Sequence, residues 1–256
     1  MTSLHMQAPN FNLDGKRALI TGGSRGLGFY AAKALAQAGA HVTLVARSKE
    51  SLKLAQDELK QAGHNCEILQ LDVTDSAAVD SSLAKNQPFQ ILVNNAGMNI
   101  PKNLVDLKNE DIDAVLNLNV KAVFYVTRKV TQQLLDAKLS GSVINISSQM
   151  GVVGSPRRTL YCASKHAIEG MTKALAWELG PENIRVNTIC PTFIHTHMTA
   201  NMFTDPEFHD WVIKKIALGR IGQPEEIMGA VVFLASPASS LVTGTALMLD
   251  GGWSAA

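Results

Sequence analysis

The chain has 256 residues, a length that suits one or two domains and that single open α/β folds often reach. Its 23 Lys and Arg residues nearly balance 22 Asp and Glu residues, which argues against nucleic-acid binding, because that function needs a basic stripe. Hydrophobic residues make up 46% and charged residues only 18%, which excludes a disordered chain and suggests a large core or surface buried between subunits.

The cysteines and the N-terminal residues give information about the cellular compartment of the protein. Cys66, Cys162 and Cys190 share no close spacing and cannot all pair, so we expect a reducing environment. No apolar run approaches the roughly 20 residues that cross a bilayer, and Met1 to Asn10 lacks the basic start and apolar stretch of a signal peptide. We therefore expect a cytoplasmic protein without a membrane partner, with residues 1–12 as a tail and 13–256 as one domain.

Short apolar runs alternate along the chain with longer stretches of helical spacing. In chain order, we expect strands over 17–21, 42–46, 67–71, 91–93, 142–147, 185–190 and 246–249. Helices are expected over 26–39, from 48 to about 63, from 75 onward, from 109 to about 138, and over 159–179 and 224–235. This alternation predicts an α/β fold with a doubly wound parallel sheet. Residues 192–223 are the least regular, and we expect a mobile substrate flap there.

A glycine-rich turn follows the first expected strand and has the sequence Thr21-Gly22-Gly23-Ser24-Arg25-Gly26-Leu27-Gly28. Glycines permit a tight turn and let backbone amides approach a phosphate at a helix N-terminus. The spacing G-x-x-x-G-x-G differs from the general dinucleotide motif. By itself, such a turn is also typical of an ordinary loop.

Together with three further motifs, this turn resembles the short-chain dehydrogenase/reductase family. These motifs are Asn94-Asn95-Ala96-Gly97, Ser148 and Tyr161-x-x-x-Lys165. The resemblance runs from about Leu13 to Trp253 and includes Asp72-Val73, Asn119, Arg185-Val186-Asn187, Pro191, Thr243-Gly244 and Asp250-Gly251-Gly252. It implies one Rossmann-like domain with seven parallel strands, a nicotinamide cofactor, and hydride transfer at a carbonyl or alcohol carbon. It extends to both the 3-oxoacyl-reductase and the sugar-acid dehydrogenase branches.

Tyr161 and Lys165 are four residues apart on an expected helix and therefore share a face. A phenol ionises near pH 10. We expect the Lys165 ammonium to lower the pKa of Tyr161, so that the tyrosine exchanges a proton with the substrate oxygen. The resemblance implies that Ser148 holds that oxygen, that Lys165 also binds the cofactor ribose, and that Asn119 supports a water-mediated proton path. The choice of Ser148 over Ser147 rests on its spacing before Tyr161.

The resemblance also implies a set of cofactor-binding positions. They are Gly22, Ser24, Arg25, Gly26, Leu27, Gly28, Arg47, Asp72, Val73, Asn95, Ala96, Gly97, Tyr161, Lys165, Pro191, Thr192, Ile194 and Thr196. Thr192 departs from the family pattern, which usually has glycine at this position beside the nicotinamide.

The end of the second expected strand, Ala46-Arg47, favours NADP(H) over NAD(H). An acid some 20 residues past the glycines selects the cofactor without a 2′-phosphate, and Ala46 occupies that position. An arginine binds phosphate with paired donors, and Arg25 offers a second contact. The alternative is that Arg47 is only a solvated loop cation.

Two weaker signals leave alternatives open. Arg157 and Arg158 precede Tyr161 and either attract an anionic substrate or form a solvated surface pair. His195 and His197 fall short of a zinc site because no carboxylate or cysteine partner is nearby, so we expect no metal.

We predict an NADP(H)-dependent oxidoreductase that acts on a small carbonyl or secondary alcohol substrate. The first alternative is an NAD(H)-dependent sugar-acid or alcohol dehydrogenase, and the second is a non-catalytic cofactor-binding scaffold. An isomerase or dehydratase on the same scaffold would normally show a changed catalytic set. The low charge fraction suggests a homo-oligomer, and the resemblance implies a homotetramer.

Overall fold

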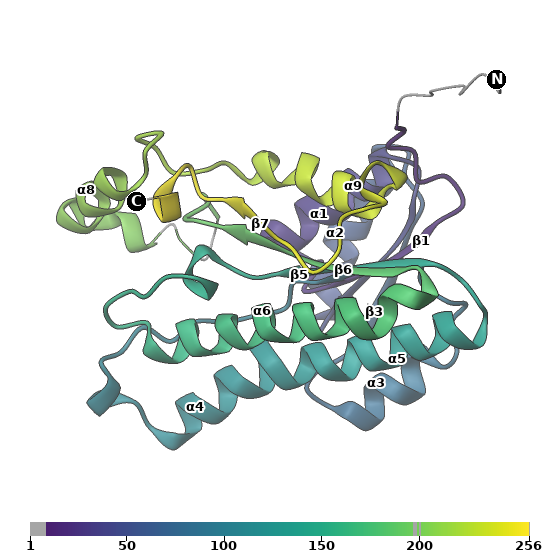
Figure 1. The fold of residues 1–256 in the computed structure, drawn as a ribbon, viewed down its shortest axis with the longest axis horizontal. Helices are drawn as coiled ribbons and strands as arrows, with labels where there is room; N and C mark the ends of the chain where they lie inside the picture. The colour runs from purple at the N-terminus through teal and green to yellow at the C-terminus, as the bar shows by residue number, and fades with distance from the viewer. Residues whose placement is uncertain (1–8, 197–198, 200, 256) are drawn as a thin grey trace.

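In the computed structural model, which describes residues 9–196, 199 and 201–255, the chain forms one parallel sheet of seven strands (Figure 1). The strands are β1 (Arg17–Thr21), β2 (His41–Ala46), β3 (Cys66–Gln70), β4 (Ile91–Asn94), β5 (Gly141–Ile146), β6 (Ile184–Pro191) and β7 (Ala246–Leu249). They pair in the order β3-β2-β1-β4-β5-β6-β7, and every pairing is parallel. This confirms the predicted fold class.

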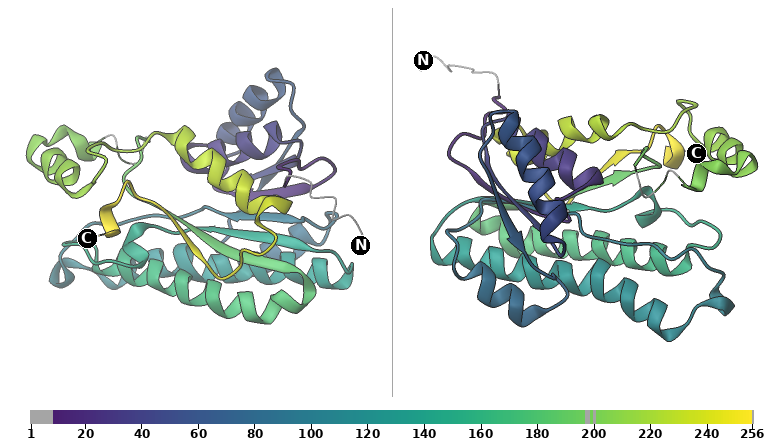
Figure 2. Two further views of the ribbon diagram at one scale, coloured as in Figure 1. Left: turned by 45° about the horizontal axis from the view of Figure 1, so that its top comes forward. Right: turned by 180° about the vertical axis from the view of Figure 1, so that it is seen from behind.

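Helices cover both faces of the sheet, as both views of Figure 2 show. They are α1 (Gly26–Gln37), α2 (Lys49–Gln61), α3 (Ser76–Leu83), α4 (Asn109–Leu116), α5 (Ala122–Asp136), α6 (Thr159–Leu179), α8 (Pro206–Lys215) and α9 (Met228–Ala235). Helices α1, α2 and α9 pack on one face, and α3, α5 and α6 on the other (Figure 1). Because both faces are covered, β4 and nearly all of β1 are buried, and their centres are continuous apolar runs over 18–20 and 91–93.

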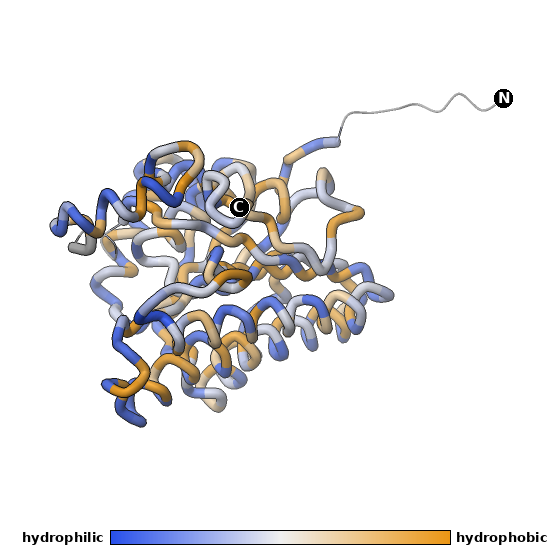
Figure 3. Tube along the Cα trace, turned by 60° about the vertical axis from the view of Figure 1, so that its left-hand side comes forward, coloured by the Kyte–Doolittle hydropathy of each residue, from blue (hydrophilic) through white to orange (hydrophobic). Residues whose placement is uncertain are grey.

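The helices begin where the local chemistry satisfies their first N–H groups. The Ser48 side chain accepts a hydrogen bond from Ser51 N, and the Asp75 side chain accepts one from Ala78 N. Along α2 only Leu52, Ala55 and Leu59 are buried, which gives the apolar stripe of an amphipathic helix. Figure 3 shows the same pattern as hydrophobic and hydrophilic segments that alternate along the helices.

The stretch 109–138, expected as one long helix, contains an interruption. Between α4 and α5 lies a five-residue π-helical segment, η2 (Asn117–Lys121). Such segments insert one extra residue into a helix and occur often at functional sites. Here the segment carries Asn119, which is only 1% exposed.

Residues 192–223, expected to be the least regular part of the chain, contain the helix α8. Asp205 caps this helix by accepting hydrogen bonds from Glu207 N and Phe208 N, and Pro206 occupies the first turn. An aromatic cluster holds the helix against the body and consists of Phe193, Phe203, Phe208, Trp211 and Trp253. The mobility of the segment stays a prediction.

Packing of the domain begins at Leu13, which is 1% exposed and donates a backbone hydrogen bond to Ala38 O. Most of the predicted tail, residues 1–8, lies outside the described residues. Within the described part of the chain, no helix is long and apolar enough to span a membrane. The three cysteines Cys66, Cys162 and Cys190 are free thiols.

The point that positions the site is the boundary between β1 and β4. The chain runs outward through β2 and β3, then returns to place β4 on the other side of β1. Crevices of open α/β sheets form at the carboxyl ends of strands where the order reverses in this way. The glycine-rich turn after β1 and the Asn-Asn-Ala-Gly segment at the end of β4 therefore meet at that edge.

Candidate active site

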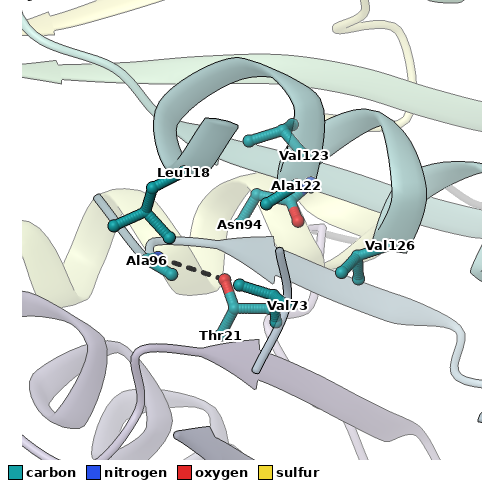
Figure 4. Close-up of a pocket in the computed structure, with 8 residues that line it drawn as sticks. All are labelled: Thr21, Val73, Asn94, Ala96, Leu118, Ala122, Val123 and Val126. Carbon is teal, nitrogen blue, oxygen red and sulfur yellow. Dashed lines mark hydrogen bonds between the residues drawn. The ribbon is translucent and has the colours of Figure 1, made fainter. Parts of the chain in front are cut away.

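A single hydroxyl ties the ends of β1 and β4 together. Thr21 Oγ1 accepts hydrogen bonds from Asn95 N at 3.0 Å and from Ala96 N at 3.1 Å. The second of these bonds is drawn in Figure 4, where the labelled residues come from β1, β4, η2, α5 and the segments that follow β3 and β4. The gap they line has no room for a water molecule. This region is therefore structural support beneath the site and not a ligand pocket.

The glycine-rich turn is held by close backbone packing. Asn95 Nδ2 donates to Thr21 O and Gly22 O, both at 3.1 Å. Gly22 has a φ of +63°, and a Cβ atom on it would lie 2.8 Å from Asn95 Nδ2. A Cβ on Gly28 would collide with the same amide and with Gly22 O. These two glycines are therefore required by the protein's own packing.

Gly26 differs, because a Cβ there would meet nothing within 4 Å, although its φ is +56°. It opens α1, whose N-cap residue Arg25 makes no side-chain cap. The first N–H groups of α1 thus have no side-chain cap from Arg25, and a phosphate is a suitable acceptor for such groups. Ser24 and Leu27 flank this turn. The residues present fit a dinucleotide pyrophosphate.

Two charged residues lie beyond β2 and β3, where the adenosine end of a dinucleotide would lie. Asp72 accepts hydrogen bonds from Thr74 N at 3.0 Å and Thr74 Oγ1 at 2.7 Å, and these bonds lower its pKa, opposed by partial burial. The Arg47 guanidinium contributes a further lowering of the Asp72 pKa. Arg47 is exposed after Ala46, and Val73 is buried beside Asp72.

Tyr161 lies near the start of α6, and its pKa contradicts the expectation from its spacing to Lys165. Desolvation is the largest influence and raises the pKa of Tyr161 to about 12. A hydrogen bond with the Ser148 side chain and the charge of Arg158 lower the pKa less. The structure thus brings Ser148 to the phenol, as the spacing predicts. Without cofactor, the tyrosine is a protonated phenol at neutral pH.

Lys165 lies next to Tyr161, but its ammonium is hydrogen-bonded to the main chain of β5. Its Nζ donates a hydrogen bond of 2.8 Å to the Ile146 carbonyl at the end of β5, and it lies 5.6 Å from the Tyr161 ring centroid. Burial lowers the pKa of Lys165 to about 8, opposed in part by Cys190 and Glu169. The ammonium is therefore desolvated and oriented by the sheet.

Asn119 is bound through both ends of its amide. Its Oδ1 accepts from Met98 N and its Nδ2 donates to Met98 O, each at 2.9 Å. Nδ2 also donates to Ser164 Oγ at 3.0 Å, and Ser164 Oγ donates to Tyr161 O at 2.8 Å. A Cβ on Gly97 would lie 3.4 Å from Asn119 Oδ1 and 3.9 Å from Lys165 Nζ. These contacts place Asn119, Gly97 and Lys165 together.

The end of β6 supplies the remaining predicted positions. Thr192 N, directly after Pro191, donates to Leu249 O at 3.1 Å, while Thr192 Oγ1 is buried without a hydrogen-bond partner among the described residues. Ile194 is buried and forms a bridge with Gly222. Thr196 N donates to Thr199 Oγ1 at 2.9 Å.

A cavity of about 330 Å³ lies between the loop before α6 and the helix α8. It shares Phe193 and Phe208 with the apolar cluster against which Tyr161 packs. It is lined by Pro101, Ser155, Pro156, Arg157, Arg158, Phe193, Asp205, Phe208 and Trp211. Helix α8 forms one wall of this cavity and was not expected from the sequence, although the pair Asp205-Pro206 is a helix-start signal.

Metal binding has no support in the described part of the chain, which shows no group of three or more His, Cys, Asp or Glu side chains placed to hold an ion. His197, considered with His195 as a weak candidate, lies outside the described residues.

Comparisons with known proteins decide the family. A family model described as enoyl-(acyl carrier protein) reductase matches residues 22–254. The chain is 39% identical to gluconate 5-dehydrogenase from Gluconobacter oxydans, over 94% of this chain and 96% of that protein. It belongs to the short-chain dehydrogenase/reductase family. This family membership confirms the predicted resemblance and makes the protein an oxidoreductase.

Two further relatives represent both predicted branches. This short-chain dehydrogenase/reductase is 41% identical to the 3-oxoacyl-[acyl-carrier-protein] reductase of Chlamydia trachomatis, over 93% of this chain and 96% of that protein. Its fold matches the crystal structure of a gluconate 5-dehydrogenase from Burkholderia cenocepacia in complex with NADP and tartrate. That match has a TM-score of 0.92 and 33% identity, and it covers 96% of this chain and 98% of the other.

Proposed function

We propose that this oxidoreductase transfers hydride between NADP(H) and a carbonyl or secondary alcohol carbon, with Tyr161 as general acid and base. The observation that carries the proposal is the hydrogen bond between Tyr161 and the Ser148 side chain, together with Lys165 Nζ at 5.6 Å from the Tyr161 ring centroid. Ser148 is 6% exposed and its hydroxyl also accepts from Met150 N at 3.1 Å, so its position is set by the backbone.

In the reduction direction, the protonated Tyr161 hydroxyl donates its proton to the oxygen of the carbonyl. When bound, the reduced nicotinamide would supply a hydride to the carbonyl carbon, and the nicotinamide itself would become oxidised. Ser148 donates a hydrogen bond that holds the same oxygen while negative charge develops on it. The Lys165 ammonium stabilises the resulting phenolate, because an opposite charge nearby favours the ionised form. In oxidation, each proton moves in reverse.

The preference for NADP(H) is supported by Ala46 and Arg47 at the end of β2. Arg47 is close enough to Asp72 to lower the pKa of its carboxyl, so its guanidinium lies at the adenosine end of the fold. The Burkholderia cenocepacia relative has NADP in its crystal structure. Gly22, Gly26 and Gly28 provide the phosphate cradle, and Asn95, Ala96 and Gly97 line the path toward the nicotinamide.

We further propose a cytoplasmic homotetramer with residues 192–223 as a substrate flap. Large apolar side chains are exposed on α5 and α6, where Phe124 is 50% and Trp177 is 86% exposed. Leu241, which precedes β7, is 97% exposed. Exposed apolar side chains of this size on long helices suit contact with further copies of the chain.

The decisive experiment is a panel of ketones, 3-oxoacyl thioesters and keto-sugar acids, with NADPH consumption and alcohol product both measured. Tyr161→Phe is expected to lower kcat by about two orders of magnitude or more, because the proton donor is lost. NADPH binding, measured by fluorescence titration, should survive in the variant. Undiminished turnover in Tyr161→Phe would refute the mechanism, and cofactor binding without turnover of any substrate in the wild type would favour the scaffold alternative.

A further inference from the structure

Two adjacent arginines before α6 have different environments. Arg158 is 8% exposed, whereas Arg157 is exposed, and both line the cavity of about 330 Å³. The backbone of Arg157 has a φ of +61°, a left-handed conformation that side chains other than glycine rarely adopt. Strain of this kind persists where surrounding structure requires it and is frequent at binding sites. The turn at Arg157 directs the chain so that Arg158 is enclosed.

The buried guanidinium of Arg158 acts on the proposed proton donor. Its charge lowers the pKa of Tyr161, and the phenol in turn raises the pKa of Arg158 against the effects of burial and of Arg157. A guanidinium keeps its charge even when desolvated, because its pKa is far above neutrality. The cavity therefore contains a permanent cation within electrostatic range of the reacting hydroxyl.

The rest of the lining is mostly apolar, and its other polar members are Ser155, Arg157 and Asp205. Phe193, Phe208 and Trp211 give the cavity apolar walls. Asp205 is the acidic lining residue, but its Oδ1 already accepts hydrogen bonds from Glu207 N at 3.0 Å and Phe208 N at 3.4 Å. The N-terminal dipole of α8 thus stabilises the Asp205 carboxylate in its position at the start of this helix.

From this arrangement we infer that Arg158 binds the carboxylate of a small hydroxy or oxo acid whose reacting carbon lies at Tyr161. The inference rests on the proposed function and names its substrate class. A guanidinium matches a carboxylate through two parallel hydrogen bonds, and the cavity volume suits a small ligand. An acidic carrier protein would instead meet exposed cations such as Arg157, because a large partner cannot reach a buried side chain.

The test compares the best carboxylate substrate from the panel with its uncharged methyl ester. In Arg158→Gln we expect KM for the acid to rise about 10- to 100-fold, as for the loss of a charge-assisted hydrogen bond, with a smaller change in kcat. KM for the ester should stay within about threefold, and Arg158→Lys should recover part of the loss. Lys60→Gln, an exposed position on α2 outside the cavity lining, is the control and should change neither KM by more than about threefold. Arg157→Gln, at the other arginine of the lining, should raise KM for the acid less than Arg158→Gln does.

A second readout does not depend on turnover. Trp211 lines the same cavity, so the acid, added in the presence of NADP+, should change the tryptophan fluorescence of the wild type. That change should be absent in Trp211→Phe and should need about 10- to 100-fold more acid in Arg158→Gln. Equal effects of Arg158→Gln on acid and ester, or a larger effect of Arg157→Gln, would overturn the inference while leaving the proposed reaction intact. Absence of turnover together with intact, Arg158-dependent binding of the acid would overturn the proposed reaction alone.

Discussion

Lys165 donates a hydrogen bond of 2.8 Å to the Ile146 carbonyl, so the ammonium that should assist Tyr161 is anchored to the end of β5. This bond joins α6 to the sheet and orients Lys165 before any ligand binds. It also means that a charged group is kept in a desolvated position, and such an arrangement lowers stability in favour of function.

The first prediction concerns the loss of stability that the buried Lys165 charge causes. In the folded protein, burial lowers the pKa of Lys165 from 10.5 to about 8. Between these two pH values the unfolded chain binds a proton that the folded chain has released, so wild-type stability rises with pH across this window. At pH 7 the penalty is present in full, and Lys165→Met should be more stable than wild type by about 1–3 kcal/mol.

Urea denaturation at pH 7 and pH 10 measures this difference, which should shrink at the higher pH. Lys173→Met is the control, because Lys173 is exposed on the same helix and should show no such trend. A stability difference that stays constant or grows with pH would contradict the assignment of the penalty to the Lys165 charge.

The second prediction separates two glycines of the phosphate turn. Gly28→Ala should lower both stability and NADPH affinity, because its Cβ would collide with Gly22 O and the Asn95 amide. Gly26→Ala meets no protein atom within 4 Å and should cost only about 1–2 kcal/mol of backbone strain. It should still weaken NADPH at least tenfold, because its methyl group occupies the phosphate space. Thermal unfolding measures the stability of each variant, and NADPH titration measures its affinity for the cofactor. If Gly28→Ala and Gly26→Ala lost the same stability and the same affinity, this would argue against the cradle.

The third prediction concerns cofactor choice. Wild type should bind NADPH more tightly than NADH, and Arg47→Ala should reduce that preference about 10- to 100-fold by removing a charge-assisted contact to the 2′-phosphate. Ala46→Asp should weaken NADPH through repulsion and give the NADH ribose an acceptor. Lys53→Ala, an exposed cation further along α2, serves as the control. The idea fails if NADH binds as tightly as NADPH to wild type.

The fourth prediction concerns assembly. If α5 and α6 form an interface, Trp177→Glu should place a charge in it and reduce the tetramer to smaller species. Light scattering after size exclusion gives the mass directly. Lys60→Glu, an exposed position on α2 at the opposite face of the sheet, provides a control charge change outside this interface. A wild-type monomer at micromolar concentration would refute the tetramer itself.

The fold was predictable because its signals are local. Ile91 to Val93 is a continuous apolar run, and Val42 to Ala46 is apolar except for Thr43. Ser48 and Asp75 mark helix starts through cap chemistry. The π-helical segment around Asn119 could not be foreseen, since an extra residue in a helix leaves the hydrophobic spacing nearly unchanged. Helix α8 had a readable signal in Asp205-Pro206, but the surrounding aromatic residues lack clear periodicity.

The residues that form the site were predictable from the sequence, but their burial and its effect on their pKa values were not. The spacing of Tyr161 and Lys165 correctly indicates proximity, and the contact of Ser148 with the phenol agrees with its position in the chain. Sequence spacing carries no measure of burial, however, so the rise in the Tyr161 pKa that desolvation causes was missed. The difference between Arg157 and Arg158 was also invisible, because neighbouring residues can have opposite exposure wherever the backbone turns.

The position of β1 in the middle of the sheet has a consequence for synthesis on the ribosome. β1 pairs with β2 on one side and with β4 on the other. The first three strands can associate as soon as they emerge, yet the second edge of β1 stays open until Ile91–Asn94 has been translated and has left the exit tunnel. During that interval the nascent chain exposes an apolar, unpaired strand edge, the kind of surface to which other nascent chains add. Slow translation just before β4 would prolong that exposure, whereas slow translation after β4 would not.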